Sequence, residues 1–359
     1  MAAISLPEEL KKKMADVFNA ALKNAIELDA ALVRIREEQE RMNAFDEFYS
    51  LVSTICSPID NRDPIVRYVC ALVAELAYHH VTKFEIDDKC SKRAKVIPCE
   101  EYQKIIAGGV PANVGNYLQG LESIKYFVVV DPGIVAVGIA FNGMLFIGFR
   151  GTQFLFDWRI NIRSKLLQVN QRFRYHSPYA SNYINARLHK GFAEEALRIS
   201  YRILDAIHDN NLGNINHVFL TGHSLGGAVA AIAENFIQIA PTSVITFGAP
   251  RYCDYFTSFL SSNGPPTQIQ RQGDIVPLVP PRFLGYSDQP YVFHTNGEYF
   301  NELQNRRSFL GQLWMWARFI LKYFEPHSME KYRNELGQTA GASGASSPLT
   351  PYDKIKINE

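Results

Sequence analysis

A serine set between glycines, in Thr221-Gly222-His223-Ser224-Leu225-Gly226-Gly227, constrains the fold of this chain more than any other feature. The apolar run 218–220 precedes it and the alanine-rich stretch 228–233 follows it, which predicts a strand, a tight turn and a helix. In such a nucleophile elbow the serine adopts strained backbone angles and its Oγ projects from the turn, while side chains at Gly222 and Gly226 would collide. An ordinary glycine-flanked turn is the alternative, and the strand and helix context favours the elbow.

An elbow serine needs a base to take its proton, an acid to orient that base, and donors for an oxyanion. In α/β-hydrolases the acid and then the base follow the serine along the chain. Asp274, in Gln272-Gly273-Asp274-Ile275-Val276-Pro277, is the most promising acid, because it comes directly after the strand-like run 268–270. A carboxylate there reaches the same rim of a sheet as the elbow. An aspartate that caps its own loop is the alternative.

The base must be a histidine, and of the nine in the chain only His294 and His327 follow Asp274. Apolar and aromatic neighbours predict that His294 lies in a strand, and it follows Asp274 too closely to return easily to the rim. His327 follows Pro326 at a break between two helical stretches, and loops carry catalytic groups more readily than packed strands do. We therefore expect His327 to be the base and His294 to be structural.

An oxyanion hole needs two backbone N–H groups aimed at one point, and one of them comes from the residue after the nucleophile, here Leu225. The second should come from the end of an earlier strand. The run 144–149 predicts a strand reached through an Asn142-Gly143 hairpin turn, and it leads into Arg150-Gly151-Thr152. Thr152 is therefore the second candidate donor, although an ordinary turn explains Arg-Gly-Thr equally well.

Several separate blocks of this chain resemble class 3 lipases, the family typified by secreted fungal triacylglycerol lipases, which also includes plant phospholipase A1 and galactolipase enzymes. The matching blocks occur in the family's order over roughly residues 65–335. They are Phe149-Arg150-Gly151-Thr152 with Asp157-Trp158, His189-Lys190-Gly191-Phe192, Gly222-His223-Ser224-Leu225-Gly226-Gly227, Thr246-Phe247-Gly248-Ala249-Pro250-Arg251, Asp274-Ile275-Val276-Pro277 with Pro280-Pro281, and His327-Ser328-Met329-Glu330-Lys331-Tyr332.

The resemblance implies acyl transfer to water, with Ser224 as the nucleophile, Asp274 as the acid and His327 as the base. It also implies Thr152 and Leu225 as the oxyanion donors. No metal or organic cofactor is required for this chemistry. The block around His189 matches the family too, but its place before a predicted helix indicates an architectural role.

In class 3 lipases the segment after the Arg-Gly-Thr turn forms a lid, which here would be residues 153–161. Its aromatic and aliphatic residues could cover an acyl groove and turn toward lipid at an interface, or they could pack against the core. The stretch 163–187 carries Arg163, Lys165, Arg172, Arg174 and Arg187. These side chains could favour an anionic headgroup, although a basic loop is more often only solvated.

Composition limits the partners of this chain. A formal net charge of +1 and the absence of a basic patch interleaved with aromatics argue against nucleic acid. We expect a lipid or small ester substrate, with a transient membrane or lipid-droplet interface, and the oligomeric state is not predicted.

The apolar segment 310–321 contains Arg318 and is shorter than the ~20 residues of a bilayer span, so we expect a helix near the active-site mouth.

The first residues lack both a basic region and a continuous apolar run, so no signal peptide is visible. The five cysteines are an odd number without metal-ligand spacing, which is typical of reduced thiols. We expect a cytoplasmic or interface-associated protein, or a secreted one if a leader was removed.

The predicted fold class is α/β, an α/β-hydrolase fold with a mixed, mostly parallel central sheet flanked by helices. A capping box at Ser5-Leu6-Pro7-Glu8 and apolar residues at helical spacing predict an N-terminal helix to about Phe45. Packing across the body is its expected role, with dimerisation or membrane docking as alternatives. The predicted organisation is a helical extension at 1–64, a hydrolase domain at 65–335 and a flexible tail at 336–359.

Two functions from different classes fit the sequence. The first is a serine carboxylic-ester hydrolase that acts on acyl esters of glycerolipids, phospholipase A1-type activity included. The second is a catalytically silent lipase-like protein that binds lipids or signals. The set Ser224, Asp274 and His327 favours the enzyme, because a binding module has no physical need for all three.

Overall fold

A computed structural model gives the structure of the chain, and it describes residues 47–77, 124–131, 134–150, 166–168, 187–255, 257, 264–299 and 325–342. Within these residues, seven strands form one sheet in the order β1-β2-β3-β6-β7-β8-β9. The strands are β1 (Lys125–Asp131), β2 (Ile134–Phe141), β3 (Met144–Arg150), β6 (His217–His223), β7 (Thr242–Phe247), β8 (Thr267–Gln270) and β9 (Tyr291–His294).

The first three strands of the sheet pair antiparallel, and every pairing from β3 to β9 is parallel. The β2–β3 hairpin turns at Asn142 and Gly143, which both have positive φ, as a two-residue hairpin turn requires. Two short strands, β4 (Leu166–Gln168) and β5 (Arg187–His189), form a separate antiparallel pair. The prediction of a mixed, mostly parallel α/β sheet is confirmed.

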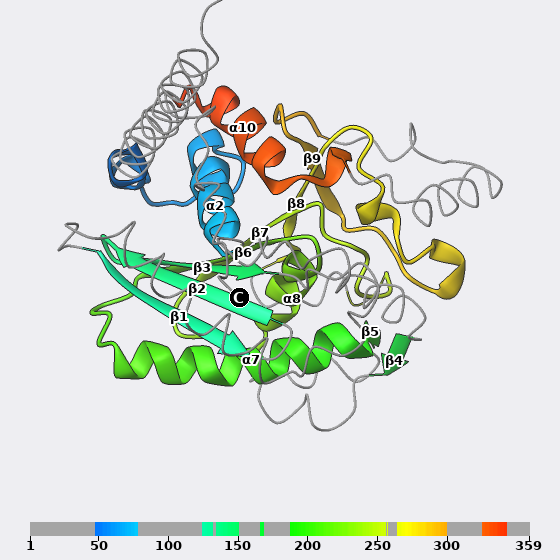
Figure 1. Ribbon diagram of the computed structural model, residues 1–359, viewed down its shortest axis with the longest axis horizontal. Helices are drawn as coiled ribbons and strands as arrows, with labels where there is room; N and C mark the ends of the chain where they lie inside the picture. Colours follow the sequence, from blue (N-terminus) through cyan, green and yellow to red (C-terminus); the bar gives the residue numbers. More distant parts are fainter. Residues whose placement is uncertain are drawn as a thin grey trace, which may run out of the picture.

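Helices cover both faces of this sheet (Figure 1). On one side lie α2 (Pro64–Leu76) and α10 (Met329–Ala340), and on the other lie α7 (Lys190–Asp209) and α8 (Leu225–Ala233). Helix α2 begins at Pro64 because the Asp63 side chain caps it, accepting from the Ile65 N–H at 2.8 Å, and because proline fits the first turn of a helix.

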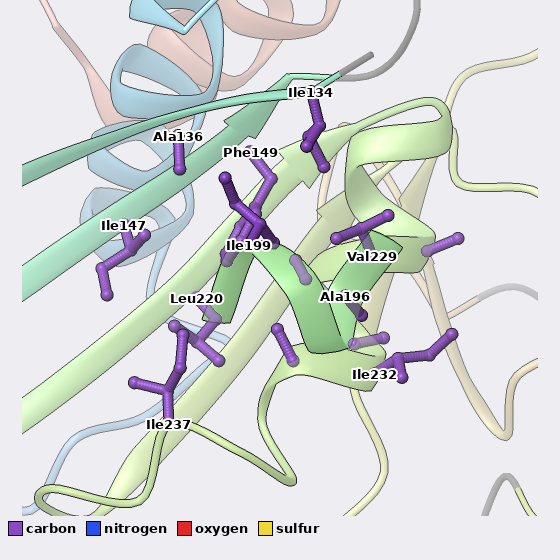
Figure 2. Packing of buried hydrophobic residues seen from close by; sticks show 14 of the residues in the cluster. Ile134, Ala136, Ile147, Phe149, Ala196, Ile199, Leu220, Val229, Ile232 and Ile237 are labelled. Atoms are coloured by element: carbon purple, nitrogen blue, oxygen red, sulfur yellow. The ribbon is translucent and has the colours of Figure 1, made fainter. Parts of the chain in front are cut away.

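The side chains of each strand point alternately to the two faces of the sheet, so the apolar core has two parts, one under each layer of helices. In β6, Val218 and Leu220 pack with the residues of α7 and α8, whereas Phe219 packs with those of α2 and α10. Figure 2 shows the first of these clusters, in which Ile199 of α7 and Val229 of α8 meet the sheet. Because side chains alternate along a strand, both faces of the central strands must be apolar, as a sheet covered on both sides requires.

Residues 336–340 are helical, whereas the sequence predicts that a flexible tail begins at residue 336. Helix α10 continues to Ala340, and Leu336 is buried in the cluster shared with α2. Gly341 ends the helix in the left-handed conformation. The small and polar residues after Gly337 suggested a tail, but packing of the apolar side of α10 extends the helix.

Three other expectations lie outside the described residues: the long N-terminal helix, the lid at 153–161 and the apolar helix at 310–321. A described helical segment at residues 47–54 places Phe48 edge-on against Phe146, with ring centroids 6.1 Å apart. None of the helices in the described part of the chain combines the length and apolar character needed to cross a bilayer.

Candidate active site

Ser224 occupies the sharp turn between β6 and α8. Its backbone angles are φ 57° and ψ −133°, a conformation that non-glycine residues rarely adopt. The turn is held by backbone hydrogen bonds, because the Ser224 N–H donates to the Phe247 carbonyl at 2.9 Å and the Ser224 carbonyl accepts from Gly227 N–H at 3.0 Å. This is the strand, turn and helix expected of a nucleophile elbow.

Glycines around the serine allow the strand and helix to approach this closely. A Cβ on Gly222 would lie 2.5 Å from the Gly226 carbonyl oxygen and 2.8 Å from the Phe149 carbonyl oxygen. A Cβ on Gly227 would lie 2.8 Å from that of Ala249. Since backbone atoms cannot move aside as a flexible side chain can, the elbow requires glycine at Gly222.

Asp274 lies in the loop that follows β8, and its side chain is fully buried. One carboxylate oxygen, Oδ1, accepts from the Val276 N–H at 2.9 Å. The other, Oδ2, accepts from His327 Nδ1 at 2.8 Å. The structure therefore brings together the acid and base candidates, which are far apart in the sequence.

His327 ends the short 3₁₀ helix η8 (Glu325–His327), immediately before α10. With Nδ1 donating to Asp274, the other ring nitrogen, Nε2, is buried and has no hydrogen-bond partner among the described residues. The neutral imidazole then presents Nε2 as an acceptor, which is the state a general base needs. His294 lies in β9 as expected, and its carbonyl accepts from Gly297 N–H at 2.9 Å.

His223 directly precedes the serine and packs against the base. The two imidazole rings, of His223 and His327, have centroids 4.3 Å apart. Burial, and then the proximity of His327, hold the pKa of His223 well below its usual value of 6.5. His223 therefore stays neutral and adds no second positive charge when His327 takes up a proton. Sequence reasoning assigned it no role, although its place inside the serine motif is the signal that marks it.

Tyr332 of α10 also reaches Asp274, since its hydroxyl donates to Oδ2 at 2.6 Å. Tyr332 ends the sequence block that begins at His327 and resembles class 3 lipases, but the sequence alone assigned it no role. Gly248, after β7, makes room for these groups. A Cβ there would lie 2.7 Å from Asp274 Oδ2, 2.9 Å from the Tyr332 hydroxyl oxygen and 3.0 Å from His327 Cε1.

Of the two oxyanion-hole candidates, Leu225 is the first residue of α8. The first N–H groups of a helix have no hydrogen-bond partner within the helix, and they lie at the positive end of the helix dipole. This position therefore suits a developing negative charge. Thr152 lies outside the described residues.

His189 is buried and caps the start of α7. Its Nδ1 accepts from the Phe192 N–H at 3.4 Å, and its ring stacks on Phe192. This contact agrees with the architectural interpretation. Among the described residues, no group of three or more His, Cys, Asp or Glu side chains is arranged to hold a metal ion.

Residues 146–284 match the model of the family described as lipase (class 3), which confirms the resemblance that the motifs indicate. The secreted mono- and diacylglycerol lipase 1 of Fusarium solani is 33% identical over 117 residues, which are 31% of this chain and 33% of that protein. A lipase of Rhizopus niveus is 28% identical over 152 residues, 40% of this chain and 36% of that protein. The chain thus spans about a third of the length of these curated relatives.

Solved lipase structures are also similar to this chain. The Rhizomucor miehei triacylglyceride lipase matches with a TM-score of 0.41 at 18% identity, over 68% of this chain and 91% of that one. The Lip2 lipase of Yarrowia lipolytica matches with a TM-score of 0.40 at 20% identity, over 48% of this chain and 66% of that one.

Proposed function

Since this chain carries a class 3 lipase region at residues 146–284, we propose that it is a serine carboxylic-ester hydrolase that cleaves acyl esters of glycerolipids. The observation that carries the proposal is the pairing of His327 with Asp274, with the His327 ring packed on His223, the residue directly before the strained Ser224 turn. Strain at a non-glycine residue is retained where function requires it.

In the proposed mechanism, Ser224 Oγ attacks the ester carbonyl while His327 Nε2 takes its proton. Asp274 accepts from Nδ1, which fixes the tautomer and stabilises the imidazolium as it forms. The carbonyl oxygen becomes an oxyanion, which accepts from the N–H groups of Leu225 and Thr152. Loss of one such donor costs about 2.7 to 4 kcal/mol of transition-state stabilisation.

The tetrahedral intermediate collapses when His327 returns its proton to the departing alcohol, and Ser224 remains acylated. Water then attacks the acyl-enzyme, giving its proton to His327. The second tetrahedral intermediate breaks at the bond to Ser224 Oγ while His327 returns the proton to that oxygen, which releases the carboxylic acid and regenerates both the serine hydroxyl and the neutral base. The His223 ring, whose pKa burial holds well below 6.5, packs against His327.

For the substrate, we propose an acylglycerol. The Fusarium solani relative is named as a mono- and diacylglycerol lipase, which supports this class. Phospholipase A1-type hydrolysis of the sn-1 ester is the alternative within the enzyme proposal. A catalytically silent lipid-binding or signalling protein is the alternative outside it, and the close Asp274–His327 hydrogen bond favours the enzyme.

We further propose that residues 65–335 form the core of the hydrolase, extended to Ala340 by the end of α10. In the part of the chain that the structure describes, Cys56, Cys70 and Cys253 form no disulfide. These thiols support a cytoplasmic or interface-associated location, whereas the Fusarium solani relative is named as secreted. A lipid interface as partner belongs to the same proposal.

The test is hydrolysis of p-nitrophenyl esters from acetate to palmitate, with detergent or lipid present, by the wild type and Ser224→Ala side by side. We expect the variant to fold normally and to lose at least about 10³-fold in kcat. Diacylglycerol and phosphatidylcholine vesicles then separate the two substrate classes. Undiminished hydrolysis by a folded Ser224→Ala protein would refute the proposed nucleophile, and no turnover of any ester by the wild type would favour the binding protein.

A further inference from the structure

The Tyr332 hydroxyl lies between two parts of the site. One is the loop of residues 271–275 that follows β8 and carries Asp274, which we call the acid loop, and the other is α10, the helix that follows His327. The hydroxyl donates to Asp274 Oδ2 at 2.6 Å and accepts from the Arg271 N–H at 3.0 Å. A backbone N–H can only donate, so the single hydroxyl proton of Tyr332 is directed to Asp274. Burial, and then the Asp274 charge, raise the pKa of the phenol well above 10.0, which keeps that proton in place.

Three donors converge on the Asp274 carboxylate. Val276 N–H occupies Oδ1, and His327 Nδ1 and the Tyr332 hydroxyl share Oδ2. The backbone contact by itself leaves the carboxylate plane free to turn about Oδ1. A second donor on Oδ2, fixed to a helix, removes that freedom and keeps the oxygen aimed at the imidazole.

The helix that carries Tyr332 is itself tied to both sides of the site. Arg271, the first residue of the acid loop, donates to the Pro326 carbonyl at 2.6 Å and pairs with Glu335 of α10 at 2.7 Å. The Pro326 carbonyl belongs to the residue before His327. The acid loop, the base and α10 therefore share one hydrogen-bonded support.

From this arrangement we propose that Tyr332 is a positioning residue, which acts through Asp274 to hold the His327 imidazole in its catalytic orientation. The inference rests on the proposed function, because it assigns a role within that site. Tyr332 does not touch the reacting atoms, and its contribution passes through the Asp274–His327 hydrogen bond.

Tyr332→Phe tests this inference in the full chain, with Tyr252→Phe as the matched control. Tyr252 is also a buried tyrosine, but its hydroxyl donates to Gln289 at 3.1 Å. One hydrogen bond to a charged group predicts a kcat about tenfold lower for Tyr332→Phe, with KM for p-nitrophenyl butyrate unchanged. Tyr252→Phe should keep the kcat of the wild type for each folded molecule. A kcat of Tyr332→Phe within twofold of the wild type overturns the inference.

A second measurement reads the hydrogen bond without turnover. The low-field proton signal of His327 Nδ1, assigned by its loss in His327→Ala, should move upfield and exchange faster with water in Tyr332→Phe. An unchanged signal overturns the inference. If Tyr332→Phe does not fold, p-aminophenylalanine at position 332 keeps a donor on the ring and should retain both the signal and kcat, and loss of both would count against the role.

Failure of the proposed function gives a different pattern. If the wild type hydrolyses no ester in a Ser224-dependent manner, the enzyme proposal fails whatever Tyr332→Phe does. If the wild type is active and Tyr332→Phe is equally active with an unchanged Nδ1 signal, only the positioning role fails.

Discussion

Gly248 controls how closely the acid, the base and Tyr332 approach one another. Its φ is +55°, a region that side chains with a Cβ rarely enter, and three atoms of the site fill the space where that Cβ would be. Glycine is therefore required at this position both by the positive φ and by the lack of space for a Cβ. Gly248 lies in the block 246–251 that resembles class 3 lipases, but only the folded structure shows that this glycine faces Asp274.

Gly248→Ala should lower kcat by at least about tenfold, because a displaced Asp274 loses its alignment with His327. It should also cost about 1 to 2 kcal/mol of stability from the left-handed backbone alone. Gly213→Ala is the control, since Gly213 has a φ of +85° with nothing within 4 Å of its Cβ position. Ester kinetics and urea unfolding of both variants make the comparison, and equal kcat in the two would contradict the account.

Helices α2 and α10 meet through a buried ion pair. Arg333 Nε donates to Glu75 Oε2, with the Arg333 side chain fully buried and that of Glu75 nearly so. Burial raises the pKa of Glu75, while Arg333 opposes that shift. The pair therefore joins α2 to α10, which carries Tyr332 and follows His327.

Arg333→Met alone should destabilise the protein by about 3 to 5 kcal/mol, because it leaves a buried carboxylate without its partner. Replacing both residues, with Glu75→Leu and Arg333→Met, should recover much of that loss. Urea unfolding of the two single variants and the double variant measures the coupling. Additive effects of the two substitutions would show that the pair does not act as a unit.

Local patterns predicted the elbow, β8 before Asp274, and β9 around His294, because each is encoded within a few neighbouring residues. The choice of His327 followed from chain order and from the break at Pro326. The Tyr332–Asp274 hydrogen bond joins residues 58 positions apart in the sequence, so it could be identified only from the folded structure. The end of α10 was missed for the same reason, since burial of Leu336 against α2 extends a helix that the local composition does not favour.

The stability of the whole molecule should respond to pH through the buried His223. The pKa of His223 is held well below 6.5 in the fold, while the unfolded chain has the ordinary value. Below pH 6.5 the unfolded state therefore binds a proton that the folded state does not, and stability falls as pH decreases. One such group removes up to about 1.4 kcal/mol of stability per pH unit in that window.

Urea unfolding between pH 7.5 and 5.5 checks this expectation. His223→Gln should flatten the fall in the free energy of unfolding below pH 6.5 relative to the wild type. Comparison with the wild type removes the contributions that the two proteins share. Equal slopes in the wild type and His223→Gln would contradict the buried, neutral state of His223.

The most direct test of the central claim, that Ser224 is a nucleophile activated by His327 and Asp274, is covalent labelling by a fluorophosphonate followed by mass spectrometry. The account predicts one adduct per chain, located on Ser224, formed at comparable rates by the wild type and His294→Ala and at least about 10³-fold more slowly by His327→Ala. An adduct on another residue, or equal labelling of Ser224 without His327, would contradict it.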